Sequence, residues 1–162
     1  MNKIAILLIL FCTAGTFSQS NQDLLSHYKK YYKQMQSQAD IQGVINALTH
    51  LNVLEPSQAR KDTLATLYMN EGRHVEALNT IGVDKNDSDS DLAVQVKAFS
   101  LKAINDVEQA MVHYEELFKR KPNPFIAYEL AEMKIRTGDL MGATRNITFG
   151  IANSSGDIVR NY

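Results

Sequence analysis

The sequence predicts an all-α fold, an α-solenoid of about four helix-turn-helix repeats. Three observations lead to this prediction. In residues 64–81, apolar side chains recur at three- and four-residue spacing on both sides of Gly72, which is the pattern of two helices joined by a tight turn. The same pattern returns every 33 residues. Pro56 and Pro122 follow two of the second helices, at points where a helix cannot continue.

Three columns of residues define the 33-residue step. A small or apolar residue opens the inner face of each second helix, an apolar residue follows four positions later, and a turn residue precedes both. The small residues are Val44, Ala77, Ala110 and Ala143, the residues four positions later are Leu48, Ile81, Tyr114 and Ile147, and the turn residues are Ala39, Gly72, Asn105 and Gly138. We expect Ala77 and Ala110 to be almost inaccessible, because the two helices of a unit cross there.

The first unit is the least regular, with several tyrosines in its first helix around 25–36. Its second helix, 41–54, is clearer: Ile41, Val44, Ile45, Leu48 and Leu51 form an inward stripe, and Asp40 is well placed as the N-cap. The four units are predicted at about 25–57, 58–90, 91–123 and 124–156, within a repeat domain spanning 19–162.

At these positions the sequence resembles the tetratricopeptide repeat (TPR) family, whose motif places small and aromatic residues at fixed offsets. The second unit matches with Lys61, Leu64, Ala65, Tyr68, Ala77, Ile81 and Asp89, and the third with Val94, Lys97, Ala98, Leu101, Ala110, Tyr114 and Pro122. The step is 33 residues where the family usually has 34, and no unit has the tryptophan. Another class of helical-hairpin repeat is therefore the alternative.

Residues 1–18 are predicted to be a signal peptide. Lys3 supplies the positive start, residues 4–11 are an unbroken apolar run, and 16–18 offer small residues at the positions that a signal peptidase reads. The run is too short to span a bilayer. We therefore expect an exported protein, periplasmic or on the cell surface, without stable membrane insertion. Cys12 raises a lipoprotein alternative, but that processing requires a small residue where Phe11 stands.

Composition argues against several other classes. The net charge is -1, and no basic face or glycine-rich phosphate loop is present, so we expect no nucleic-acid partner. Cys12 is the single cysteine, so the chain after residue 18 has neither a disulfide framework nor a cysteine zinc site. No cofactor and no metal site are expected.

The polar stretch 84–91 raises the possibility of a calcium loop, because alternating Asp and Asn oxygens suit a hard cation. Its sixth residue is Asp89 and not glycine, and its twelfth is Gln95 and not glutamate, so a solvated loop is the better interpretation. Glu71 and His74 have a spacing used by di-iron bundles, but they straddle the Gly72 turn. No serine or cysteine has a base beside it in the pattern, so we expect no catalytic residues and no enzyme.

In the TPR family, ligand-facing residues lie on the first helix of each unit, away from the packing stripe. The resemblance therefore implies a binding scaffold that holds an extended peptide or a partner helix in a concave groove. The matching positions are Lys29, Lys33, Gln36, Asp62, Thr66, Met69, Gln95, Phe99, Lys102, Tyr128, Glu132 and Ile135.

This set is basic at its N-terminal end and aromatic and acidic at its C-terminal end. The expected ligand has an acidic part near Lys29 and Lys33 and an apolar anchor near Phe99 and Tyr128. The TPR subclass that grips a terminal carboxylate is matched only at Lys29, so a free C-terminal carboxylate is not the expected ligand.

The alternative function is a structural or oligomerising element whose C-terminal end docks on another copy or domain. Residues 157–162 begin like another first helix and then stop after about a turn and a half. A solenoid needs a polar cap on its last repeat. We therefore expect Leu140, Ala143, Ile147 and Ile151 to be partly uncovered, which gives either a longer protein or an interface.

Overall fold

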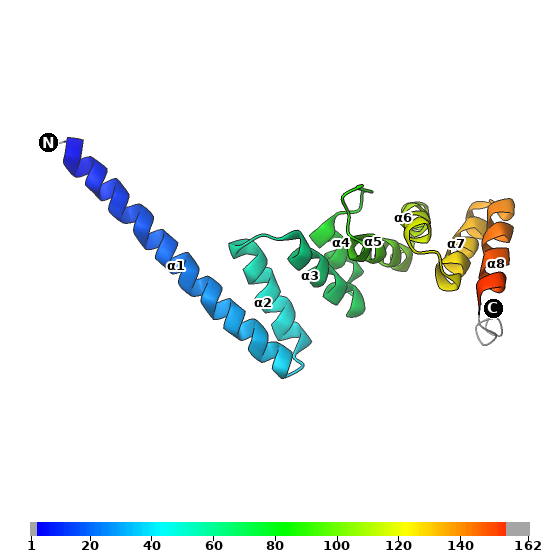
Figure 1. The fold of residues 1–162 in the computed structure, drawn as a ribbon, viewed down its shortest axis with the longest axis horizontal. Coiled ribbons are helices and arrows are strands. Elements are labelled where there is room, and N and C mark those ends of the chain that lie inside the picture. The colour runs from blue at the N-terminus through cyan, green and yellow to red at the C-terminus, as the bar shows by residue number, and fades with distance from the viewer. Residues whose placement is uncertain (1–2, 155–162) are drawn as a thin grey trace. The chain divides into compact units, whose positions relative to one another are not determined.

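The computed structural model describes the backbone of residues 3–154 and the side chains of residues 20–154. This part of the chain is all α, with eight helices and no strand (Figure 1). The predicted fold class is therefore confirmed. The predicted helix start at 157–162 lies outside the described residues. The helices are α1 (Lys3–Ser37), α2 (Ile41–Leu54), α3 (Gln58–Asn70), α4 (His74–Ile81), α5 (Asp91–Ala103), α6 (Val107–Arg120), α7 (Pro124–Thr137) and α8 (Leu140–Asn153).

The four predicted turn residues all adopt the left-handed conformation. Their φ angles are 54° at Ala39, 73° at Gly72, 67° at Asn105 and 86° at Gly138. Glycine tolerates this conformation without strain, whereas alanine has a Cβ that crowds the backbone. The 33-residue step therefore sets the backbone geometry of each hairpin turn even where the residue type does not favour it.

An aspartate follows three of these turn residues and caps the next helix. Asp40, Asp106 and Asp139 accept hydrogen bonds from backbone N–H groups three residues later, at 2.9, 3.2 and 2.8 Å. These bonds satisfy donors that the first helical turn leaves without an intrahelical partner. The predicted N-cap at Asp40 is confirmed, and Arg73 is the one member of this column without a side-chain cap.

The chain divides into two compact units that are larger than the single repeats. Residues 1–64 are called the first unit and residues 65–162 the second unit below, and the boundary lies inside α3. In the first unit, α2 packs against α1. Gly43 has no side chain where Met35 of α1 lies, so the two helices approach closely. Tyr28 of α1 stacks on His50 of α2, with ring centroids 4.3 Å apart. Val44, Leu48 and their neighbours on the predicted inward stripe of α2 are buried, but Ile41 is 39% exposed.

In the second unit, side-chain contacts define two layers of helices. Phe99 of α5 stacks on Phe125 of α7, and Phe118 of α6 contacts Phe149 of α8 edge to face. First helices therefore lie beside first helices, and second helices beside second helices. The core between the layers is apolar, and its buried members include Leu78, Val94, Ala98, Leu101, Ala110, Tyr114, Leu117, Ile126, Leu130 and Met133.

Ala110, in this core, and Ala77, in a second buried cluster, are both fully buried, as expected. Ala77 of α4 packs with Ala65 of α3 and Val96 of α5. Within residues 65–162, this contact connects the end of α3 to α4 and α5. Among the described helices, none combines the length and apolarity that crossing a membrane requires.

Candidate functional site

The aromatic pair Phe99–Phe125 is a partly exposed apolar feature on the first-helix layer of the second unit. The two rings are nearly parallel, with an angle of 8° and centroids 5.9 Å apart. Phe99 also packs against the buried Tyr114, while Phe125 is 44% exposed. Phe99 is thus held from below by the core and offers its outer side, with Phe125, to solvent.

A group of ion pairs lies on the same two helices, one turn beyond Phe99 on α5. Lys102 of α5 binds Glu129 and Glu132 of α7, with 2.7 Å between Lys102 Nζ and Glu132 Oε2. Burial by itself would lower the pKa of Lys102, but hydrogen bonds with both carboxylates raise it on balance. Lys102 and Glu132, two predicted ligand-facing residues, therefore bind each other and connect α5 to α7.

The remaining predicted residues of the second unit differ in exposure. Gln95, Glu132 and Ile135 are exposed, and Thr66, Met69, Phe99 and Lys102 are half-buried. Tyr128 is buried, with 8% of its surface exposed, because its ring packs on α8 where Gly150 has no Cβ. Phe125, and not Tyr128, is the ring that stacks on Phe99.

In the first unit, Lys29, Lys33 and Gln36 are exposed along α1. Lys29 forms an ion pair with Glu55, at 3.4 Å between Nζ and Oε2. Asp62 is only 5% exposed and accepts a hydrogen bond from Gln58 at 2.7 Å. The basic end of the predicted set is therefore accessible, whereas Asp62 is not.

A hollow of about 490 Å³ lies between α7 and α8. It is mostly apolar, and Glu129 and Glu132 line its edge. Leu140 and Ile151 are 64% and 55% exposed, in agreement with the expected uncovered end, but Ala143 is buried at 2%. The lining residues are Tyr128, Glu129, Ala131, Glu132, Ile135, Ile147 and Ile151.

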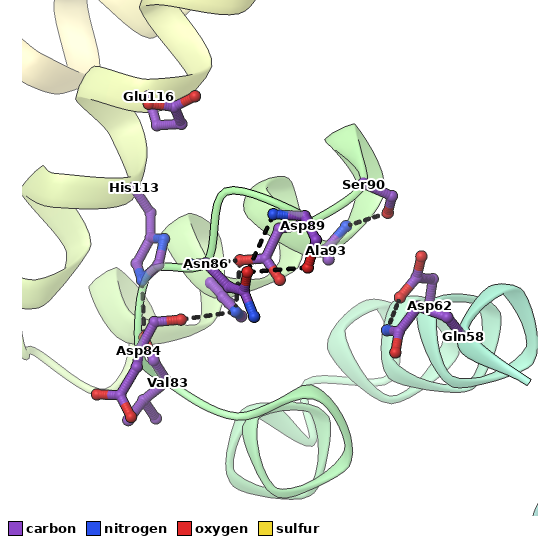
Figure 2. A network of polar contacts seen from close by, with 12 residues as sticks. Gln58, Asp62, Val83, Asp84, Asn86, Asp89, Ser90, Ala93, His113 and Glu116 are labelled. Carbon is purple, nitrogen blue, oxygen red and sulfur yellow. Dashed lines mark hydrogen bonds and ion pairs between the residues drawn. The ribbon is translucent and has the colours of Figure 1, made fainter.

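The polar loop 82–90 is held by side chains of α5 and α6. Lys97, which is 2% exposed, donates to the Asp84 carbonyl at 2.7 Å and to the Asp89 carboxylate at 2.6 Å. His113 donates from Nε2 to the Val83 carbonyl at 2.7 Å (Figure 2). A calcium ion at this loop would coordinate such oxygens. The Lys97 ammonium binds two of them instead.

A second set of charges fixes the exposed side of this loop. Glu116 of α6 accepts from Arg120 and from Lys85, and these bonds lower the pKa of the Glu116 carboxyl to about 2. Arg120 also donates to the Asp89 carbonyl at 2.8 Å. The loop 82–90 is the longest connection between described helices. Side chains of the two helices that follow it, α5 and α6, therefore hold it in place.

No catalytic arrangement emerges among the described residues. His74 Nδ1 lies 3.4 Å from Ser100 Oγ, a pair that the sequence pattern did not reveal. Ser100 is fully buried inside α5, so its hydroxyl cannot reach a substrate, and we interpret this contact as satisfying a buried polar group. Within residues 20–154, no three His, Cys, Asp or Glu side chains form a cluster that could bind a metal ion.

Comparison with known proteins supports the fold. No protein-family model and no curated protein matches the sequence. A crystal structure of MamA protein is 16% identical, with a TM-score of 0.66, and the match covers 81% of this chain and 73% of that one. The MamA RS-1 ArsTM double mutant is 14% identical, with a TM-score of 0.63 and coverage of 94% and 95%.

A third structure is a tetratricopeptide repeat protein from Parabacteroides merdae ATCC 43184. It is 18% identical, with a TM-score of 0.61, and the match covers 81% of this chain and 52% of that one. The present chain thus spans about half of that protein. These structures share their fold with this chain, which has a TPR-like fold.

Proposed function

We propose that this protein is a non-enzymatic scaffold for protein–protein interaction, which binds an extended peptide or a partner helix on the first-helix face of α5 and α7. Repeat folds of this type present a continuous row of first-helix side chains that a ligand can follow. We also propose that the protein is exported, on the grounds of the apolar run and small residues in 1–18.

The observation that carries the proposal is the aromatic pair Phe99–Phe125. Aromatic side chains supply much of the binding energy in protein interfaces, because they bury a large area at low entropic cost. Phe99 is already fixed by Tyr114, so little further order is lost on binding. Lys102, one helical turn from Phe99, and its partner Glu132 offer charged groups to polar parts of a ligand.

The hollow between α7 and α8 supports the alternative, a self-docking element. Its apolar lining and the exposed Leu140, Met141 and Ile151 make a surface that a second copy could cover. A structural element would use this surface, whereas a scaffold would use the aromatic pair. The two functions therefore predict different contact residues.

Site-specific photo-crosslinking separates them. A photoreactive phenylalanine analogue replaces Phe125, Val75 or Ile151 in the full chain, in cells that make the protein. A scaffold should give crosslinks to a different protein from position 125 and none from Val75, an exposed residue of α4. Crosslinks to another copy from position 151, with none from position 125, would support the self-docking element. Equal crosslinking from all three positions would contradict both.

A further inference from the structure

A separate hollow of about 430 Å³ lies among α6, α7 and α8. Phe118 and Phe149 form its aromatic part, with centroids 4.9 Å apart and an angle of 83° between the rings. The buried Leu130 also contributes to the lining. The other lining residues are Glu115, Lys119, Lys134, Arg145 and Asn146.

The charges around this hollow are unbalanced. Three of its side chains are cationic and one is a carboxylate. Glu115 is bound to Lys134, with 3.2 Å between Oε1 and Nζ. Neither Lys119 nor Arg145 has an ion-pair partner among residues 20–154. The hollow therefore presents two cations whose charge the described part of the chain leaves uncompensated.

Asn146 adds a polar group to the lining of this hollow. Its surface is only 8% exposed, yet its side-chain amide makes no hydrogen bond within residues 20–154. The amide atoms of Asn146 are not among the buried atoms without a partner, so they are open to the hollow and can bond to a ligand. One repeat earlier, 33 residues back, His113 is also buried and donates to the carbonyl of Val83. Asn146 occupies the corresponding position in α8, and residues 20–154 offer it no corresponding acceptor.

We propose that this hollow binds an acidic segment of a partner protein. Asp or Glu carboxylates of the segment pair with Lys119 and Arg145, an apolar side chain rests on Phe118 and Phe149, and the Asn146 amide bonds to the segment's backbone. Charge complementarity selects the occupant: two cations that residues 20–154 leave unpaired, beside aromatic rings, suit carboxylates that flank an apolar residue. This surface is distinct from the face of α5 and α7, and either can bind without the other.

Nuclear magnetic resonance titration of the ¹⁵N-labelled full chain tests this. The probe is the blocked peptide acetyl-Glu-Asp-Leu-Asp-Glu-amide, and its control is acetyl-Gln-Asn-Leu-Asn-Gln-amide, which has the same shape without charge. The acidic peptide should shift the side-chain amide signals of Asn146 and the Nε–H signal of Arg145. Binding should weaken as salt rises, since the carboxylate contacts are partly exposed.

Matched variants locate the binding. Reversal of one charge with Arg145→Glu, or separately with Lys119→Glu, should weaken the acidic peptide by about tenfold. Lys30→Glu reverses an exposed charge on α1, outside this hollow, and should change binding by less than about twofold. Melting curves show which variants remain folded. If only one of Arg145→Glu and Lys119→Glu folds, that variant alone is compared with Lys30→Glu.

Three results overturn the proposal. The first is an absence of shifts at Asn146 and Arg145 with millimolar acidic peptide. The second is equal binding of the charged and uncharged peptides. The third is an equal loss on Lys30→Glu and Arg145→Glu, which would mean that the attraction is unspecific.

Discussion

The ammonium of Lys97 lies 2.6 Å from the carboxylate of Asp89, and only 2% of the lysine side chain is exposed. The pair joins the first turns of α5 to the loop that precedes it. Lys97 also donates to the Asp84 carbonyl, so its charge is satisfied by two oxygens. A buried charge with such partners costs little while the arrangement is intact and much when one partner is removed.

Removal of the lysine charge should therefore destabilise the second unit. We expect Lys97→Met to lower the free energy of unfolding by roughly 3 kcal/mol, because Asp89 is then left mostly buried without its cation. Urea unfolding followed by circular dichroism measures it, with the exposed Lys30→Met as a control within about 0.5 kcal/mol of the parent. The double variant Lys97→Met with Asp89→Asn should lose less than the two single losses combined. Strict additivity would show that the two residues do not interact.

His113 should make stability depend on pH. Burial lowers the pKa of His113 below 6.5, and the hydrogen bond to Val83 only partly opposes this. As pH falls below about 6.5, the unfolded chain binds a proton at this position more readily than the folded chain does. Stability from this residue is therefore complete above pH 7 and is lost on acidification toward the lowered pKa.

The measurement compares melting temperatures at pH 7.5 and 5.5 for the parent and for His113→Gln. The variant should be less stable at pH 7.5, and the difference between the two proteins should shrink at pH 5.5. Carboxylates that titrate in the same range are common to both proteins. A gap that stays constant with pH would contradict the assignment of a neutral, buried His113.

The turn column offers a stabilising substitution. Ala39 has a φ of 54°, a conformation that glycine adopts without strain. Ala39→Gly should raise the free energy of unfolding by about 0.5 kcal/mol, after the greater freedom of glycine in the unfolded chain is deducted. Gly72→Ala is the matched reversal and should lower it by about 1 kcal/mol. Changes of the same sign at both positions would show that left-handed strain is not what distinguishes them.

The helix crossings tolerate no larger side chain. Ala77 and Ala110 have no exposed surface, so Ala77→Leu and Ala110→Leu should each cost about 1 to 3 kcal/mol through overpacking. Thermal melting tests both, with Ala103→Leu at the exposed end of α5 as the control. Unchanged midpoints for both core variants would mean that these crossings can expand without strain.

Most of the structural features that the sequence could predict follow from its 33-residue period. A fixed step places each turn at one point of the repeat, so the four left-handed residues were predictable as turns even though Ala39 does not favour that conformation. The same step puts Asp40, Asp106 and Asp139 directly after a turn, where a cap is needed. These features are local, and they depend on short stretches of backbone.

Side chains at contacts between helices were harder to place. Tyr128 was expected to face a ligand, but Gly150 of α8 leaves a space that the tyrosine ring fills. Phe125 was overlooked because its stacking on Phe99 depends on the rotation of α7 relative to α5, which no local pattern fixes. Asn146 stands out only when burial and hydrogen bonding are known together.

The binding of loop 82–90 by the following helices bears on proteolysis. A protease needs several residues of backbone to detach and extend before it can cut. The loop offers Lys85 as an exposed basic residue, but the carbonyls of Val83, Asp84 and Asp89 are hydrogen-bonded by His113, Lys97 and Arg120. Cleavage after Lys85 therefore requires these bonds to open, and its rate would report how often α5 and α6 release the loop.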